Sequence, residues 1–211
     1  MRKKINKPPI FWQKAKKVLS ANDKKLSKLI KLYPDDFLFS KSDPFFTLAR
    51  SIVGQQISVK AAQSVWNKLE IKVKKINPKN IITTHSSTLK SVGLSRQKVT
   101  YLKNIASAFI EKKIKTSMWN EMNNEEIIQD LIQIKGIGRW TAEMFLIFNL
   151  CRADVYPLDD IGMIKALCKL NNIPYPTKRE IVIQVGKKWK PYRSVATWYL
   201  WRSLDPIPVE Y

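Results

Sequence analysis

The segment IKGIGR, residues 134–139, carries two glycines one residue apart, and it lies between two stretches whose apolar residues have helical spacing. Glycine adopts backbone torsions that other residues avoid, so we expect both glycines to support a tight hairpin between two helices. The missing side chains would also let the amides at the start of the second helix face an anion, and a DNA phosphate fits that description. An ordinary glycine turn gives the same pattern, so the segment alone does not decide between the two interpretations.

The charge of the chain indicates the same kind of partner. Lysine and arginine number 38 against 17 acidic residues, which gives a formal net charge of +21 and a pI of about 10.0. A folded protein with a field of this sign and size favours nucleic acid or an anionic membrane surface. Biased codon usage could raise the lysine content, because isoleucine and asparagine are abundant too, but it does not explain the shortage of acids.

Metal and membrane chemistry have little support in the sequence. Cys151 and Cys168 are the only cysteines, too few for a four-cysteine zinc or iron–sulfur site, so we expect no metal, no cofactor and two buried, reduced thiols. The basic start MRKKINKPPIFWQKAKK lacks the apolar stretch of a signal peptide, and no apolar run approaches a membrane span. We therefore expect no membrane contact and a cytoplasmic location, at the nucleoid in a prokaryote.

Four blocks of the sequence resemble one family of DNA-repair enzymes. The segment IKGIGRWTAEMF, residues 134–145, resembles the helix-hairpin-helix of the DNA glycosylase superfamily that includes endonuclease III and the adenine-mismatch glycosylases. The segment YPLDDIG, residues 156–162, resembles the aspartate-bearing loop of that superfamily. The segments IVGQQISVKAA, residues 52–62, and WKPYRSVATWYLW, residues 189–201, are similar to the minor-groove wedge region and the C-terminal helix of its 3-methyladenine DNA glycosylase II branch. The blocks follow the order of the family, and together they span residues 52–201, which is most of the chain.

The resemblance implies an all-α, two-lobed helical glycosylase fold with a helix-hairpin-helix motif and an active-site cleft between the lobes. It implies a monofunctional DNA glycosylase of base excision repair, which flips alkylated bases of the 3-methyladenine and 7-methylguanine type out of the duplex and excises them by hydrolysis, leaving an abasic site. The partner would be double-stranded DNA containing damaged bases, bound by a monomer. A glycosylase for uracil, mismatched or oxidised bases, and a helix-hairpin-helix module without catalysis, remain the alternatives.

The family's catalytic aspartate stands immediately before an Ile-Gly pair, and the resemblance therefore assigns this role to Asp160. Breaking an N-glycosidic bond develops oxocarbenium character on the sugar, much as in glycoside hydrolysis. A carboxylate beside the sugar stabilises that charge, orients the attacking water, or does both. Asp160 could instead serve only as a helix N-cap, and its neighbour Asp159 is the alternative residue, which could take the capping role.

Position 140 separates two mechanisms. In the bifunctional members of the family a lysine follows the arginine of the hairpin and attacks the sugar as a Schiff-base amine, whereas this chain has Trp140. Tryptophan has no nucleophilic nitrogen, so lyase chemistry through a lysine at this position is excluded. The endonuclease III relatives also carry four cysteines for an iron–sulfur cluster, which this chain cannot build. Both departures agree with the monofunctional branch.

The resemblance also implies a base pocket and a wedge. Trp140 and Trp201 match the aromatic pocket positions, and Met144 stands where the branch can place a tyrosine. Purines alkylated at N3 or N7 are cationic and stack well on electron-rich rings. Gln56 matches the position that fills the gap left by the extruded nucleotide. Core packing is the alternative for Trp201, and a solvent-facing loop position is the alternative for Gln56.

The remaining assignments concern the hairpin and the single histidine. His85 lies in the polar stretch TTHSS and is expected to be a surface or capping residue and not a base. Binding of the DNA backbone is assigned to Lys135, Gly136, Ile137, Gly138 and Arg139.

Helical spacing runs through almost the whole chain, and no convincing strand alternation occurs. We expect about ten short helices. Their starts are marked, in chain order, by Ser42-Asp43-Pro44, Ser58, Ser95, Asn124, Arg139, Asp159-Asp160, the capping-box pattern of Thr177 with Glu180, and Pro191. Residues 1–211 would form a single glycosylase unit of two lobes. Roughly residues 45–155 would form a central lobe that ends in the helix-hairpin-helix, and residues 1–44 with 156–211 would form the second lobe.

Overall fold

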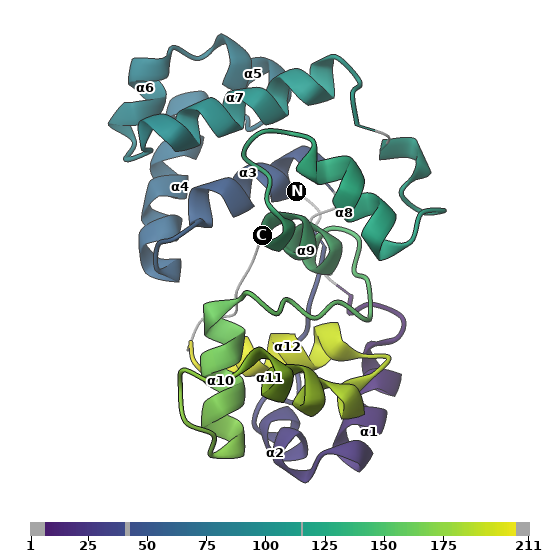
Figure 1. Cartoon of the computed structure of the whole chain (residues 1–211). Coiled ribbons are helices and arrows are strands. Elements are labelled where there is room, and N and C mark those ends of the chain that lie inside the picture. The colour runs from purple at the N-terminus through teal and green to yellow at the C-terminus, as the bar shows by residue number, and fades with distance from the viewer. Residues whose placement is uncertain (1–6, 41–42, 115, 206–211) are drawn as a thin grey trace. The chain divides into compact units, whose positions relative to one another are not determined.

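The computed structural model describes residues 7–40, 43–114 and 116–205, and all regular secondary structure over these residues is helical (Figure 1). The expectation of an all-α fold is confirmed. The chain divides into two compact units. Over the described residues, the continuous unit comprises 43–149, and the discontinuous unit comprises 7–40 together with 150–205. None of the helices in this described part of the chain is long and apolar enough to cross a membrane.

The continuous unit is organised around α3, whose buried face packs against α4, α7 and α9 (Figure 1). A helix buried on most sides needs an apolar sequence, and α3 provides it with residues such as Leu48, Ile52 and Val53. Its helices are α3 (Pro44–Gly54), α4 (Val59–Val73), α5 (Pro78–Thr83), α6 (Ser86–Ser91), α7 (Arg96–Ile110), the 3-10 turn η1 (Thr116–Met118), α8 (Asn124–Ile132) and α9 (Arg139–Phe148).

Capping side chains fix the starts of these helices. The side chains of Asp43, Ser58 and Ser95 each accept a hydrogen bond from a backbone amide of the first turn. The predicted cap at Ser95 and the predicted helix after Ser58 are confirmed. Of the predicted start Ser42-Asp43-Pro44, Asp43 is the N-cap, and Ser42 lies outside the described residues. The predicted start at Asn124 is one residue late. Asn123 is the N-cap of α8, and Glu126 completes a capping box with it.

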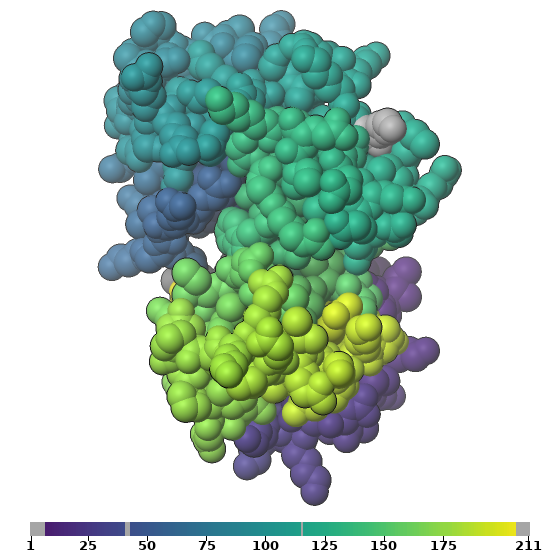
Figure 2. Space-filling view, in the orientation of Figure 1, coloured from purple at the N-terminus to yellow at the C-terminus, as the bar shows by residue number. Residues whose placement is uncertain are grey.

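The discontinuous unit joins the first part of the chain to the last. Its helices are α1 (Trp12–Asn22), α2 (Lys24–Leu32), α10 (Ile161–Asn171), α11 (Arg179–Gly186), the 3-10 turn η2 (Lys187–Trp189) and α12 (Arg193–Arg202). The central element is α12, which packs against α1, α2 and α10. In Figure 2 the purple surface of the first helices adjoins the yellow-green to yellow surface of the later part of the chain, in line with the packing of α1 against η2.

Two predicted helix starts in this unit are wrong. The capping box of Thr177 and Glu180 does not form, because α11 begins at Arg179 with Lys178 as an N-cap that makes no side-chain capping bond. The last helix does not open at Pro191. Tyr192 is the N-cap residue and the helix begins at Arg193.

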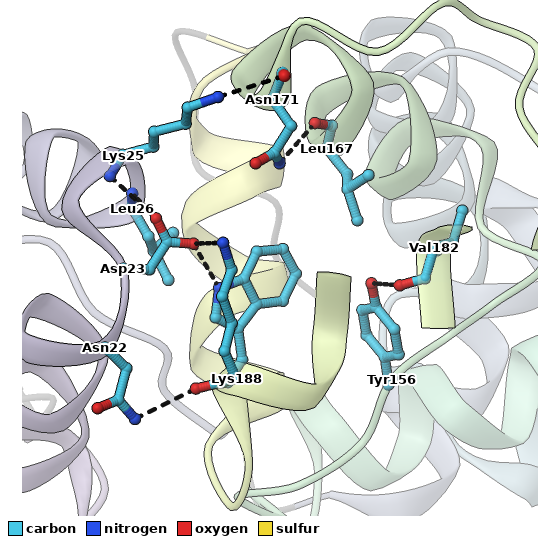
Figure 3. A network of polar contacts seen from close by, with 10 residues as sticks. Asn22, Asp23, Lys25, Leu26, Tyr156, Leu167, Asn171, Val182 and Lys188 are labelled. Carbon is cyan, nitrogen blue, oxygen red and sulfur yellow. Dashed lines mark hydrogen bonds and ion pairs between the residues drawn. The ribbon is translucent and has the colours of Figure 1, made fainter. Parts of the chain in front are cut away.

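A buried aspartate, Asp23, connects the first helices to the last ones (Figure 3). As the N-cap of α2, its Oδ1 accepts hydrogen bonds from the amides of Lys25 and Leu26. Its Oδ2 accepts the indole N–H of Trp189 at 2.9 Å and pairs with the ammonium group of Lys188, also at 2.9 Å. One carboxylate therefore satisfies a helix terminus, a buried indole and a lysine from the opposite end of the chain.

Replacing Asp23 by alanine is expected to lower the free energy of unfolding by about 2 to 3 kcal/mol, because it removes a helix cap and leaves the Trp189 indole without its acceptor.

Burial raises the pKa of Asp23, but the hydrogen bonds from Lys188 and Trp189 outweigh this and hold the pKa below its usual value. The ionised carboxylate stabilises the fold above the unfolded-state pKa of about 4, and this contribution is lost as the pH falls through the lowered folded pKa. Urea unfolding at neutral pH and near pH 3 should show the difference in unfolding free energy between wild type and Asp23→Ala becoming smaller at low pH, and a constant difference would contradict this account.

Candidate active site

The loop that leads to Asp160 is held by α11 and α12. Arg193 binds the carboxylate of Asp154 with two nitrogens, at 2.7 and 2.8 Å. One residue later, the amide of Val155 donates to the Ser194 hydroxyl at 2.8 Å. The buried Tyr156 donates its hydroxyl to the carbonyl of Val182 at 2.9 Å. Consecutive residues of the loop are thus each tied to a helix, which restricts the backbone just before the predicted catalytic position.

Asp160 is the N-cap of α10 and is only 8% exposed. Its Oδ1 accepts the amide of Met163 at 2.5 Å and the indole N–H of Trp201 at 2.8 Å. The capping role that the sequence left open is therefore filled by Asp160 itself, whereas Asp159 is exposed and forms an ion pair with Arg179. Capping does not exclude chemistry, because a carboxylate has about four lone-pair positions.

Gly162 keeps the surroundings of this carboxylate open. A Cβ atom at this position would lie 3.3 Å from Asp160 Oδ1 and 3.6 Å from Cδ1 of Trp201. Any larger residue would press on the hydrogen-bonded pair. Gly162 was predicted only as part of the aspartate-bearing motif. The structural reason for a glycine is that Trp201 of α12 lies close to this position.

The three tryptophans of the C-terminal segment are all buried. Trp189 is 0%, Trp198 2% and Trp201 7% exposed. The core-packing alternative for Trp201 therefore holds, but Trp201 also donates to Asp160, whereas Trp189 donates to Asp23. The Trp201 side chain is therefore both buried and hydrogen-bonded to the predicted catalytic carboxylate.

The two glycines of the hairpin differ in conformation. Gly136 has a φ of +114°, and a Cβ atom there would lie 2.4 to 2.6 Å from atoms of Tyr101. Gly138 has a φ of −91°, which any residue adopts, and no atom would lie within 4 Å of its Cβ. The expectation of unusual torsions is confirmed for Gly136 and wrong for Gly138, whose position is open to an approaching partner.

The other hairpin residues have distinct environments. The side chain of Ile137 is buried at 4% exposure, whereas Lys135 is exposed and its carbonyl accepts a hydrogen bond from Asn104 at 3.0 Å. Any contact of Ile137 with a phosphate would therefore come from its backbone.

Arg139, the first residue of α9, binds a carboxylate of α8. Its guanidinium donates to both oxygens of Glu125, at 3.0 and 2.7 Å, and lies 3.4 Å from Glu143. The hydrogen bond from Arg139 lowers the pKa of Glu125 to about 2. Arg139 thus joins the two helices of the hairpin motif, a role that the sequence analysis did not predict.

The predicted wedge residue, Gln56, is exposed and has a φ of 58°, a left-handed conformation that is uncommon outside glycine. Its neighbour Gln55 donates from Nε2 to the carbonyl of Gly136 at 3.2 Å and to the hydroxyl of Thr141 at 3.0 Å. On the other side, Lys98 donates to the carbonyl of Val53 at 2.7 Å. Gln55 therefore ties the wedge loop to the hairpin. Gln55 was not among the predicted site residues, because nothing in a Gln-Gln pair indicates which side chain turns inward.

The remaining predicted residues lie on α9. Trp140 is half-buried and Met144, one helical turn later, is 1% exposed. The structure therefore brings the predicted site residues together in two groups. Asp160 and Trp201 are in contact within the discontinuous unit. The hairpin, Gln56, Trp140 and Met144 belong to the continuous unit.

Within the described residues, no group of three or more histidine, cysteine or acidic side chains could hold a metal ion. His85 is the N-cap of α6, as expected, and its ring accepts the amide of Ser87. Cys168 is buried, but Cys151 is only partly buried, so the expectation of two buried thiols is correct for one of them. Burial raises the pKa of Cys151 to about 11, which makes it a poor nucleophile at neutral pH.

Known proteins are similar to this chain in sequence and in fold. DNA-3-methyladenine glycosylase 1 of Schizosaccharomyces pombe is 36% identical over 193 residues, covering 88% of this chain and 83% of that protein. The alkylbase DNA glycosidase-like protein mag2 of the same yeast is 33% identical over 198 residues, covering 90% and 93%. A solved structure of S. pombe 3-methyladenine DNA glycosylase in complex with abasic DNA has a TM-score of 0.81 at 34% identity, covering 90% of this chain and 96% of that one. The family model described as HhH-GPD superfamily base excision DNA repair protein matches residues 49–191. The chain belongs to the HhH-GPD superfamily of base excision DNA repair proteins.

Proposed function

We propose that this protein is a monofunctional DNA glycosylase that excises alkylated bases by hydrolysis and leaves an abasic site. The observation that carries the proposal is the buried carboxylate of Asp160, held by the Met163 amide and the Trp201 indole at the start of α10. The names of the similar proteins, which are 3-methyladenine and alkylbase glycosylases, support the choice of alkylated bases. We propose that it acts as a monomer on double-stranded DNA, at the nucleoid in a prokaryote.

In the proposed mechanism the bond between C1′ of the sugar and the base nitrogen breaks, and its electron pair leaves with the base. The Asp160 carboxylate stabilises the positive charge that develops on the sugar. The Met163 amide at the N-terminus of α10 donates a hydrogen bond to this carboxylate and holds it in place. Water then attacks C1′ and loses a proton to the carboxylate or to solvent.

We assign base recognition to Trp140, Met144 and Trp201. An alkylated purine carries positive charge, so the faces of the two indole rings attract it. Met144 adds a polarisable apolar contact on the same helix as Trp140. A cationic base is also a better leaving group, which fits a site that relies on one carboxylate.

We assign DNA backbone binding to the hairpin, Lys135 to Arg139, and insertion into the duplex to Gln56. The open space beside Gly138 supports this assignment, because a phosphate could approach the amides that start α9. The hydrogen bonds of Gln55 would set the wedge at a fixed place relative to the bound phosphate. The absence of a lysine at position 140 predicts no lyase step.

The proposal is tested by incubating the protein with alkylated, uracil-containing and 8-oxoguanine-containing duplexes and measuring each released base. Release of methylated purines is expected, with abasic DNA that breaks only after alkali and a rate unchanged by EDTA. Release confined to uracil or 8-oxoguanine would assign the protein to another damage class. A covalent adduct trapped by borohydride would contradict the monofunctional mechanism.

Replacing Trp201 by phenylalanine is expected to slow single-turnover base release about tenfold, because it keeps an aromatic ring but removes the indole N–H that holds Asp160. Affinity for damaged DNA should change little. Trp198→Phe is a matched control, because Trp198 is equally buried on α12 but its ring contacts are with Trp12 and Tyr199. Equal rates for the two variants would show that the Trp201 hydrogen bond does not position the carboxylate.

A further inference from the structure

The first two helices carry a row of lysines on their outer side. On α1 the core face is formed by Trp12, Ala15 and Leu19, and on α2 by Leu26 and Ile30. The opposite faces carry five exposed lysines, which are Lys14, Lys17, Lys24, Lys28 and Lys31. The lysines of α2 recur at intervals of four and three residues, so about one helical turn of 5.4 Å separates each from the next. We call these five residues the lysine face.

The lysines of the lysine face differ in their contacts from other lysines that lie close to them. Other lysines of the same region do have internal partners. Lys16 donates to the carbonyl of Pro34. In Figure 3, Lys25 donates to the carbonyl of Asn171, and Lys188 pairs with Asp23. Among the described residues, no ion pair involves any of the five ammonium groups of the lysine face.

The local charge is also unbalanced. Between residues 12 and 32 there are seven lysines and a single acidic residue, Asp23, which is buried and already paired. Five like charges on adjacent helix faces repel one another, and a polyanion relieves that repulsion. Lysine is a hydrated point charge that neutralises a phosphate without demanding a fixed geometry, which suits binding independent of sequence.

The apolar side of the two helices decides what kind of polyanion fits. A helix that lies on a membrane buries its apolar face among the lipids, but the apolar faces of α1 and α2 pack against α12, and α2 also against α10. The opposite faces present the lysines, and Leu32 at the end of α2 is an exposed large apolar side chain. A surface that is mostly cationic, with an apolar residue only at its end, matches the phosphate backbone of nucleic acid better than a lipid surface.

We propose that the lysine face is a second surface for the phosphate backbone of DNA, located in the discontinuous unit and separate from the hairpin of the continuous unit. It rests on the proposed function only in taking DNA as the partner. Its role is to hold the duplex without reading sequence or damage.

The test replaces Lys17, Lys24, Lys28 and Lys31 by glutamine, which keeps helix propensity and removes four charges. A matched control replaces four exposed lysines of the continuous unit, Lys72, Lys75, Lys79 and Lys90, and so makes the same change in net charge. The affinity of each variant for an undamaged synthetic duplex is measured as a function of salt concentration.

The slope of log affinity against log salt should become shallower by about 3 to 4 in the lysine-face variant, at about 0.9 per lost phosphate contact. The control should change the slope by less than about 1, the equivalent of one contact. Equal slopes in the two variants, or an unchanged slope in the lysine-face variant, would overturn the proposal. Loss of binding to phosphatidylserine vesicles with unchanged DNA binding would overturn it in favour of a membrane.

The outcome is independent of whether the protein is a glycosylase. Undamaged duplex contains no excisable base, so the slopes decide the role of the lysine face even if the wild type releases nothing from alkylated DNA. Conversely, base release by the lysine-face variant at saturating enzyme should equal that of the wild type, because these lysines lie outside the Asp160 site.

Discussion

Replacing Asp160 by asparagine is expected to lower the single-turnover rate of base release at least about a thousandfold, because the only carboxylate assigned to the developing sugar charge becomes neutral. Asparagine is a good N-cap, and its oxygen can still accept the Met163 amide and the Trp201 indole. The fold and the affinity for damaged DNA should therefore remain close to those of the wild type. Base release and DNA affinity are measured on the same preparation.

The matched control is Asp159→Asn. Asp159 is exposed and its carboxylate pairs with Arg179, a kind of surface contact that contributes about 1 kcal/mol or less. This variant should retain nearly the full rate. The catalytic assignment of Asp160 would be contradicted by a larger loss of rate in Asp159→Asn than in Asp160→Asn, or by an Asp160→Asn rate within tenfold of the wild type.

Replacing Gly136 by alanine is expected to destabilise the continuous unit by about 2 to 4 kcal/mol. The backbone at φ +114° disfavours any side chain, and the added Cβ would fall 2.4 Å from the Tyr101 ring, so both strain and overpacking contribute. The melting temperature and urea unfolding measure this loss. An alanine variant with wild-type stability would mean that the hairpin can shift without cost.

Gly138 provides the contrast within the same hairpin. Its backbone is ordinary and the space beside it is open, so Gly138→Val should leave the melting temperature nearly unchanged. If a phosphate occupies that space, the valine should weaken binding of damaged and undamaged duplex by similar factors. Loss of base release without loss of affinity would contradict the role of the hairpin as a backbone anchor.

The sequence predicted those features that depend on neighbouring residues. Asp43, Ser58 and Ser95 cap helices because an N-cap needs only its own side chain and the amides of the next turn. The family and the all-helical fold followed from the order of four local blocks. The two wrong helix starts, at Thr177 and Pro191, show the limit, because a capping pattern competes with the path that packing imposes on the chain.

Features that depend on distant residues could not be predicted. Residues 12–32 were assigned no helix. α1 begins there without a side-chain cap, and it packs against α12 and η2, far along the chain. α2, in contrast, has a local signal, the cap Asp23, that could have predicted its start. Likewise, the partners of Gln55 are 81 and 86 positions away, and those of Arg139 include a residue of the preceding helix.

The division of the chain has a consequence for the order in which the protein folds during synthesis. Residues 43–149 leave the ribosome as one stretch and contain all the helices of their unit, so this part can fold while the remainder is still being made. Asp23 and its partner Trp189 are 166 positions apart in the sequence. The apolar faces of α1 and α2 therefore stay uncovered until the last helices have been synthesised. During that interval the apolar faces of α1 and α2 are exposed to other chains and to chaperones. The folded continuous unit then shortens the distance that the two chain ends have to span.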